Sequence, residues 1–219
     1  MRYGAIVKGI FIERCGRFTA KCIVDGKTEI CHIGNTGRLD TVLTFGCTVF
    51  LEKSDDANRR TRYSLISAIK DTKLINIDST SPNGAVAEFL DERGIVYRAE
   101  QFFGKSRFDF KFTHDGREGF LEVKGVTLEC GGICAFPDAP TKRGVKHLHH
   151  LCEAVREGYD AAILFVIQME GVRQVRANTS THKEFGEALK EAEAAGVTVL
   201  CMGCRVSADT LKIAEIWGN

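Results

Sequence analysis

The sequence predicts an α/β protein in two parts, an all-β barrel followed by a mixed domain in the order αβββαβ and then αβ. Two observations predict this arrangement. Residues 1–80 hold short β-rich runs separated by glycine-containing turns, whereas residues 81–219 alternate helical and strand-like patterns. A polar, turn-rich segment at 79–84 separates the two textures. We therefore place the two domains at 1–80 and 81–219.

The first domain contains five short β-rich runs, at 5–12, 17–24, 28–33, 48–52 and 64–77. Asp25-Gly26, between the second and third runs, is typical of a two-residue hairpin turn. Five strands at this spacing, with little helical signal, predict a small closed barrel, and the OB-fold is the barrel that fits best. That fold commonly binds oligonucleotides on one face.

The second domain is predicted to begin with a helix. Its expected elements are a helix at 83–93, a strand at 96–103, hairpin strands at 106–113 and 119–127, a helix at 142–157, a strand at 161–168, a helix at 182–195 and a strand at 197–201. In the helix at 142–157, apolar side chains recur every three or four residues and predict one face against a sheet. They are Val145, Leu148, Leu151, Cys152 and Val155.

The predicted hairpin carries an acidic pattern. From Arg107 to Phe112 aromatic and charged residues alternate, which predicts a strand with one apolar and one polar face. Asp115-Gly116 favours a two-residue turn, and a turn centred there places Asp109 directly opposite Glu122. Lys124 follows two residues later on the same face as Glu122.

This pattern predicts a metal site and a phosphodiesterase. Opposed carboxylates repel each other, and a divalent cation such as Mg²⁺, for which Mn²⁺ can substitute, removes that penalty. Lys124 could stabilise charge on a scissile phosphate or orient the attacking water. The alternative is that these are ordinary charged residues on the wet face of a surface hairpin. A longer turn through residues 117 and 118 would also shift every pair.

Basic residues near aromatic ones suggest a nucleic-acid partner. Residues 1–80 hold 13 lysines and arginines against 9 acidic residues, and residues 81–219 hold 17 against 20. The predicted nucleic-acid-binding residues are Arg14, Arg17, Phe18, Lys21, Arg38, Arg60, Arg62, Lys142, Arg143 and Lys146. The last three lie at the start of a predicted helix, where free backbone N–H groups also favour phosphate. Alternatively, the N-terminal clusters are solvated loops, with Phe18 in the core.

Composition narrows the class of protein. The chain is 44% apolar and 27% charged, with no apolar stretch of transmembrane length and no signal-peptide pattern, so we expect a cytoplasmic protein. Nine cysteines are expected to stay reduced. Cys201 and Cys204 have a spacing that zinc could use, but Cys201 continues an apolar run and is predicted to lie in a strand. His147, on a predicted helix, is either structural or a proton-transfer or phosphate-binding group.

Three segments resemble a known family. They are Cys31–Arg38 (CHIGNTGR), Ser106–Phe110 (SRFDF) and Phe136–Leu148 (FPDAPTKRGVKHL), and they closely resemble the sugar fermentation stimulation protein A family. The resemblance implies an OB-fold domain joined to a domain like the PD-(D/E)xK nucleases, and DNA binding linked to regulation of sugar utilisation.

The resemblance also implies roles for individual residues. The superfamily's metal-binding aspartate falls on Asp109, its second acid on Glu122, its lysine on Lys124 and an upstream helix acid on Glu88. The Val123 carbonyl would join the metal shell. The proline that often precedes the superfamily's aspartate is replaced here by Phe108.

Three functions compete at this point. The first is a DNA-binding protein with a Mg²⁺-dependent nuclease site and no sequence-specific recognition, since no helix-turn-helix or zinc-finger reader is evident. The second is a non-catalytic DNA-binding regulator of sugar metabolism with a vestigial site. The third is a metal-dependent enzyme acting on a small phosphorylated metabolite. The sequence predicts neither the oligomeric state nor whether the DNA is single- or double-stranded.

Overall fold

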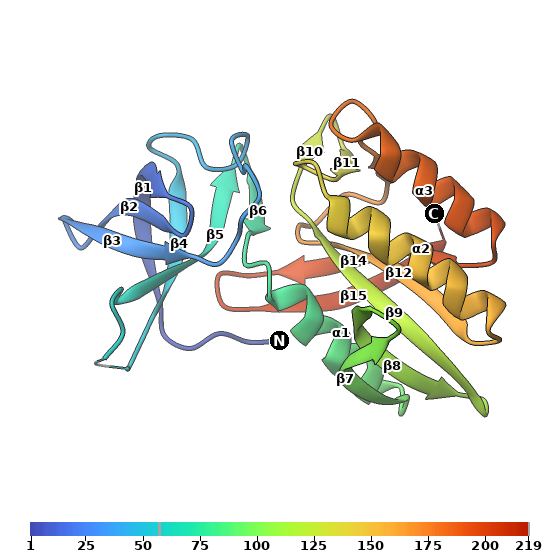
Figure 1. The fold of residues 1–219 in the computed structure, drawn as a ribbon. Coiled ribbons are helices and arrows are strands. Elements are labelled where there is room, and N and C mark those ends of the chain that lie inside the picture. Colours follow the sequence, from blue (N-terminus) through green and yellow to red (C-terminus); the bar gives the residue numbers. More distant parts are fainter. Residues whose placement is uncertain (57, 219) are drawn as a thin grey trace.

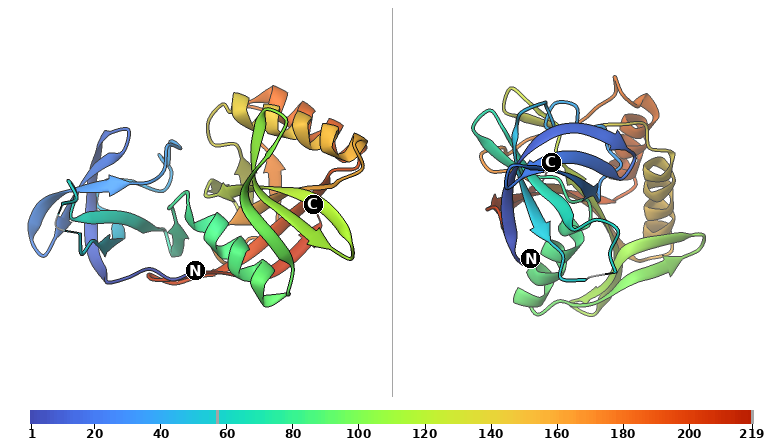
Figure 2. Two further views of the ribbon diagram at one scale, coloured as in Figure 1. Left: turned by 60° about the horizontal axis from the view of Figure 1, so that its bottom comes forward. Right: turned by 90° about the vertical axis from the view of Figure 1, so that its left-hand side faces the viewer.

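The computed structural model describes residues 1–56 and 58–218 and shows two lobes side by side (Figure 1). An N-terminal β-barrel is followed by a mixed α/β lobe, as the sequence predicts. Position 219, the last residue of the predicted second domain, lies outside the described residues. Figure 2 shows that the N-terminal segment runs from the barrel to the α/β lobe, where Arg2 bridges to Thr210 beside the last strand.

The barrel is built from five strands and closed by a parallel contact. The strands are β1 (Ile6–Gly16), β2 (Thr19–Val24), β3 (Lys27–Ile33), β4 (Thr48–Lys53) and β5 (Tyr63–Lys70). His32 and Ile33 of β3 pair with Ser64 and Leu65 of β5, which closes the sheet on itself. The predicted Asp25-Gly26 turn is present, since both residues have positive φ, 50° and 75°.

One N-terminal prediction needs correction. The run at 64–77 was expected to be one strand, but it forms two, β5 and β6 (Lys73–Asn76), which pair with each other through a tight turn. Asp71 in this turn has a φ of 54°, a left-handed conformation that aspartate tolerates better than most residues. The polar stretch Lys70-Asp71-Thr72-Lys73 marks this turn, and the apolar residues on its two sides belong to separate strands.

The α/β lobe is a six-stranded sheet with helices on both faces. Its strand order is β15-β14-β12-β9-β8-β7. The strands are β7 (Val96–Phe103), β8 (Ser106–His114), β9 (Arg117–Val126), β12 (Asp160–Ile167), β14 (Thr198–Val206) and β15 (Leu211–Gly218). Helix α1 (Ser81–Glu92) covers one face, and α2 (Lys142–Arg156) and α3 (Lys183–Ala194) cover the other (Figure 1).

The predicted αβββαβ and αβ order is confirmed, but four strands were not predicted. β15 pairs with β14 at the sheet edge, and a small sheet is formed by β10 (Glu129–Cys130), β11 (Ile133–Phe136) and β13 (Val175–Ala177). These strands are short or lie at an edge, so they lack a strong periodic pattern. Within the described residues, no helix is long and apolar enough to cross a membrane.

Helix α2 follows its sequence pattern closely. The Thr141 side chain caps its start by accepting a hydrogen bond from the Gly144 amide at 3.0 Å. Leu148, Leu151 and Cys152 are buried against the sheet. Gly158, with a φ of 91°, follows the last turn, as expected for a glycine that ends a helix.

Hydrogen bonds join the two lobes. Asn76 of β6 is fully buried, its amide donates to the Gln168 carbonyl at 2.9 Å, and its side chain accepts from Gln168 Nε2 at 3.0 Å. Glu129 makes a second connection, since Lys70 and Lys73 of the barrel approach its carboxylate at 3.2 and 2.8 Å. The lobes are therefore held by polar groups that leave little freedom at the junction.

The Glu129 connection predicts a dependence of stability on pH. The hydrogen bond from Lys73, helped by the Gly132 amide and Lys70, outweighs burial and lowers the pKa of Glu129 to about 2. Because this pKa is depressed in the folded state, its stabilisation is complete above the ordinary pKa near 4.5 and is lost as the pH falls toward 2. In urea unfolding, Glu129→Gln should lower stability at pH 7, and the difference from wild type should shrink below pH 4.5.

The matched control is Glu187→Gln, which removes an exposed ion pair with Lys183 on α3. Exposed pairs contribute little, so this variant should unfold almost as wild type does. An equal effect of Glu129→Gln at pH 3 and pH 7 would contradict the assignment.

Candidate functional site

Strands β8 and β9 separate at the predicted acidic residues. From the Asp115-Gly116 turn, the two strands pair from His114 with Arg117 up to Phe110 with Leu121. This register is the predicted one, and Asp109 and Glu122 occupy the first step beyond the paired region. From there β9 stays paired with β12, while β8 stays paired with β7. The two carboxyl groups therefore lie in a fork between strands.

The predicted simple alternation of β8 is wrong at this fork. Phe110 packs beside Tyr97 on the α1 face of the sheet, with ring centroids 5.3 Å apart. Phe108 packs instead on the α2 face, 5.7 Å from the ring of His147. The side chains of Phe108 and Phe110 thus pack on opposite faces of the sheet, because the strand changes its orientation at Asp109.

Asp109 is fixed by two hydrogen bonds. Its Oδ2 accepts from the Val123 amide at 2.7 Å, and its Oδ1 accepts from Asn83 Nδ2 at 2.8 Å. Burial and, secondly, the charge of Glu122 raise the pKa of this carboxyl, while the two hydrogen bonds and Lys124 oppose the shift. Asp109 and Glu122 are therefore close enough for the charge of one to affect the pKa of the other, as the sequence predicts.

Glu122 is buried with its two oxygens in different situations. Its side chain is 3% exposed, and its Oε1 is bonded both to Lys124 Nζ and to His147 Nδ1. Burial acts to raise its pKa, but His147 and Lys124 together outweigh burial and hold the pKa of this carboxyl below its ordinary value. Its Oε2 is buried and has no hydrogen-bond partner within the described residues.

His147 holds Glu122 from helix α2. The Arg143 guanidinium, which can only donate, approaches His147 Nε2 at 3.3 Å. Nε2 is therefore the acceptor, and Nδ1 carries the proton that it donates to Glu122. Of the roles left open by the sequence, the structure favours one in which His147 orients the acid. In the sequence, the feature that points to His147 is its position beside Leu148 on the buried face of the helix.

The residues in the fork fit a divalent cation. A buried acceptor without a partner costs about 1–3 kcal/mol, and Glu122 Oε2 faces that cost beside a second carboxyl group. A hard cation with oxygen ligands would satisfy this oxygen and offset the repulsion between the acids. Among residues 1–56 and 58–218, no group of three or more His, Cys, Asp or Glu side chains is placed to hold a metal. The side-chain donors here are two acids, and Val123 remains predicted to supply its carbonyl.

The structure does not bring Glu88 to this site. Its side chain is 50% exposed and forms an ion pair with the Met1 ammonium group near β15. Glu88 is thus engaged with the N-terminus in this arrangement, and its part in the metal shell stays a prediction. Asn83, in the first turn of the same helix, reaches Asp109 instead. Sequence reasoning missed it because its neighbours offer no charge pattern, and only the direction of α1 decides which residue faces the fork.

The predicted nucleic-acid residues of the barrel divide into two groups. Arg14 holds a loop, because its guanidinium donates to the carbonyls of Gly37 and Asn35, both at 2.6 Å, and of Arg17 at 2.7 Å, and its contact with nucleic acid stays a prediction. Phe18, by contrast, is 46% exposed rather than in the core. Arg17 lies 5.3 Å from its ring centroid, and His32 stacks on it.

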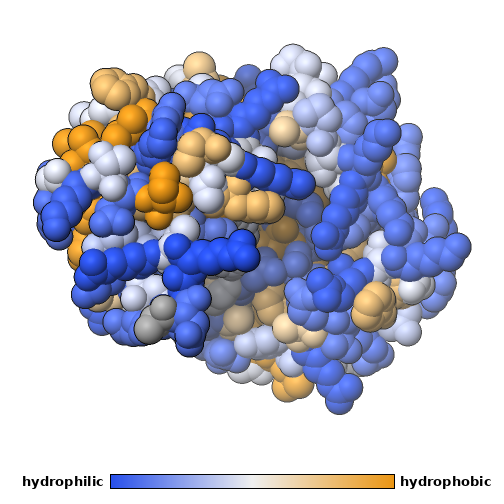
Figure 3. Space-filling model, turned by 60° about the vertical axis from the view of Figure 1, so that its left-hand side comes forward, coloured by the Kyte–Doolittle hydropathy of each residue, from blue (hydrophilic) through white to orange (hydrophobic). Residues whose placement is uncertain are grey.

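The other basic residues are on the surface. Arg38, Arg60, Arg62, Lys142, Arg143 and Lys146 are exposed, and Lys21 is half-buried in an ion pair with Glu13. Lys146 also donates to the Lys105 carbonyl at 3.1 Å, which joins α2 to the β7–β8 turn. Figure 3 shows a hollow between the two lobes with hydrophilic side chains along both margins.

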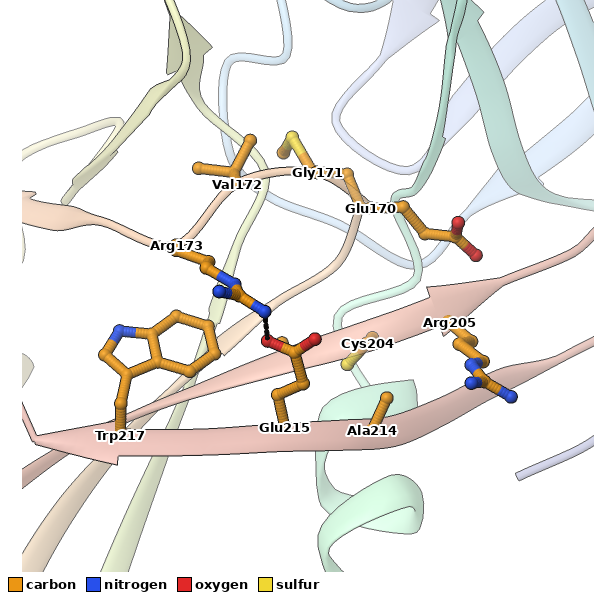
Figure 4. Close-up of a pocket in the computed structure, with 11 residues that line it drawn as sticks. Glu170, Gly171, Val172, Arg173, Cys204, Arg205, Ala214, Glu215 and Trp217 are labelled. Atoms are coloured by element: carbon orange, nitrogen blue, oxygen red, sulfur yellow. Dashed lines mark ion pairs between the residues drawn. The ribbon is translucent and has the colours of Figure 1, made fainter.

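A cavity beside the last two strands lies away from the fork. It measures about 340 Å³ and is lined by residues of β14, of β15 and of the segment 169–173 that follows β12. Arg173, Glu215 and Trp217 are among them (Figure 4). Arg173 and Glu215 pair across it at 2.7 Å, and both side chains are largely exposed. None of the predicted site residues lines this cavity, so it is separate from the acidic pair.

Comparisons with known proteins agree with this architecture. The "SfsA N-terminal OB domain" family matches residues 12–77, and the "Sugar fermentation stimulation protein RE domain" family matches residues 80–210. A "Sugar fermentation stimulation protein homolog" of Desulfitobacterium hafniense (strain Y51) is 46% identical over 220 residues, covering 98% of this chain and 96% of that protein. One from Clostridium beijerinckii is 44% identical and covers 98% and 97%.

A solved structure is similar over the whole chain. It is that of Pyrococcus furiosus SfsA in complex with Ca²⁺, with a TM-score of 0.87 and 27% identity, covering 100% of this chain and 97% of that one. Fold, acidic fork and relatives lead to one assignment: the chain belongs to the sugar fermentation stimulation protein family, with an OB domain followed by a restriction endonuclease-like domain.

Proposed function

We propose that this protein is a DNA-binding, Mg²⁺-dependent phosphodiesterase whose active site is the fork between β8 and β9. The observation that carries the proposal is the buried, unpartnered Oε2 of Glu122 beside the Asp109 carboxyl group. The relative crystallised with Ca²⁺ supports a divalent metal. We also propose that the domains divide at 1–80 and 81–219, which agrees with family matches that end at 77 and resume at 80.

Asp109 and Glu122 would hold the metal, with the Val123 carbonyl as a further ligand. When bound, Mg²⁺ would neutralise charge on a phosphodiester and lower the pKa of a coordinated water. Asn83 and His147 keep the two carboxyl groups in place, since each donates to one oxygen. Lys124 is 16% exposed and lies at Glu122 Oε1, where its ammonium group can orient the attacking water or stabilise charge on the phosphate.

The barrel and helix α2 would supply the grip on DNA. Phe18 offers an exposed ring for base stacking, and the exposed basic residues on both lobes offer phosphate contacts. None of these groups forms a sequence reader, so we propose binding without sequence specificity. The main competing function is DNA binding without cleavage. The cleavage assay described next distinguishes a nuclease from such a binding protein.

Cleavage of labelled single- and double-stranded DNA with Mg²⁺, Mn²⁺ or EDTA tests the proposal. Wild type should cut with either metal and not with EDTA. Glu122→Gln and Lys124→Ala should each lower the rate by about 100-fold or more, because they remove a metal ligand and a charge-stabilising group. Glu118→Gln and Lys111→Ala, which break an ion pair farther along the same hairpin, should cut as wild type does. DNA retention without cleavage under all conditions would leave a non-catalytic DNA-binding protein.

A second prediction concerns His147. His147→Ala removes the donor that orients Glu122, and loss of such a supporting group typically weakens metal binding by about 10- to 100-fold. Calorimetric titration with Ca²⁺ or Mn²⁺ measures this directly, without any cleavage. The control is His149→Ala on the same helix, whose side chain is 53% exposed and points elsewhere. Equal metal affinities in the two variants would refute the role given to His147.

A third prediction concerns the barrel surface. Phe18→Ala should weaken single-stranded DNA binding by about 5- to 100-fold, the effect of losing stacking worth about 1–3 kcal/mol. Phe45→Ala is the control, because Phe45 is 83% exposed but has no cation or ring stacked on it among the described residues. Fluorescence anisotropy at two salt concentrations gives both affinities. A larger loss for Phe45→Ala would move the binding face to the loop before β4.

A further inference from the structure

Two of the three distinctive sequence segments meet at a pocket that the catalytic proposal leaves unused. This interdomain pocket has a volume of about 160 Å³. One wall is the barrel loop at 35–37, and another contains Phe136 and Asp138 of the α/β lobe. The floor is residues 125–128, the continuation of β9 beyond Lys124. The pocket therefore lies between the lobes and directly after the predicted catalytic lysine.

The pocket borders the acidic fork. Gly125 lines it, and its Cα is only about 3.8 Å from that of Lys124, as for any two consecutive residues. A side chain at Gly125 would come within 2.8 Å of the Pro82 ring, and Pro82 precedes Asn83, the partner of Asp109. A group seated in the pocket would thus be the immediate neighbour of a phosphate held at the fork.

The barrel wall of the pocket is held rigidly in place. Arg14 donates to the carbonyls of Asn35 and Gly37, and Asn35 Nδ2 donates to the Ile77 carbonyl at 2.8 Å. A Cβ at position 37 would collide with Asp138 Oδ2, so any larger residue there would displace the Asp138 carboxylate from the wall of the pocket. The wall is therefore preformed, which reduces the entropy lost when a ligand binds.

The pocket is small and offers hydrogen-bonding groups. Its volume is below the roughly 300–1,000 Å³ of pockets for drug-sized ligands, and suits one planar ring system. Thr36 and Thr127 line it, and neither hydroxyl has a hydrogen-bond partner within the described part of the chain. Asp138 adds a carboxylate beside the backbone amides of Arg38 and Ala139. Hydroxyl, carboxylate and amide groups around a volume of this size can pair with the donors and acceptors on the edge of a nucleobase.

We propose that the interdomain pocket receives one unpaired base of the nucleic-acid strand whose phosphate lies at the fork. This inference rests on the proposed function and deepens it, because it names the substrate class as a strand with at least one unstacked nucleotide beside the cleaved bond. Single strands, ends and mismatched sites offer such a base at little cost, whereas an intact duplex must first lose a pair.

The test uses duplex oligonucleotides with one mismatched pair, which sets where an unstacked base is offered, and 2-aminopurine, whose emission rises when the base leaves its stack, at the mismatch or at successive positions beside it. Binding is measured by anisotropy in Ca²⁺, so that emission and affinity are read separately from cleavage. Wild type should show a several-fold rise in emission at one position only. Thr36→Trp, an exposed position from which an indole can fill the pocket, should abolish the rise. The control Thr113→Trp, also exposed but near the hairpin tip, should preserve it.

Thr127→Val gives a second measurement that does not depend on filling the pocket. It keeps the shape and removes the hydroxyl, so it should weaken binding of the single strand by about 2- to 10-fold, the effect of one hydrogen bond. DNA binding in Ca²⁺ with no position-dependent emission, or with the same emission in Thr36→Trp, would overturn the base pocket and leave the nuclease proposal intact. Absence of DNA binding in wild type would overturn both.

Discussion

The burial of one carboxylate, Glu122, is the constraint on which the centre of the molecule depends. At 3% exposure the charge needs compensation, and Lys124 and His147 supply it at a single oxygen. This concentration of donors leaves Oε2 unsatisfied in the same buried space. If stability were the only requirement, one donor on each oxygen would satisfy the carboxylate better. Under the proposed function, the oxygen left without a donor is the one that would bind the cation.

The fork between β8 and β9 solves a backbone problem as well as a chemical one. Strands that separate inside a sheet leave amide groups without their ladder partners, and such groups are costly when buried. At this fork the Asp109 carboxylate accepts from the Val123 amide and so replaces the missing strand contact. The same side chain thereby permits the separation and furnishes an acid at the point where the strands part.

The two lobes act together because their junction is polar and satisfied. Asn76, Ser81 and Gln168 are buried at this junction and bond to one another, and Glu129 binds two lysines of the barrel. Such networks specify one arrangement, since any rotation of the lobes would leave several buried groups without partners. A fixed junction gives the hollow between the lobes a defined shape, which is what a preformed binding site requires.

Local chemistry in the sequence determined much of this protein. The Asp115-Gly116 turn fixed the hairpin register, because both residues accept positive φ, and the apolar spacing of α2 fixed its buried face. Tertiary structure decided the rest. Glu88 pairs with the Met1 ammonium group, and Asn83 donates to Asp109. Arg14 donates to the carbonyls of a loop, and Phe18 is exposed. These contacts depend on the direction of the helices and on residues far away in the chain. The spacing of apolar and polar residues within one segment determines neither of them.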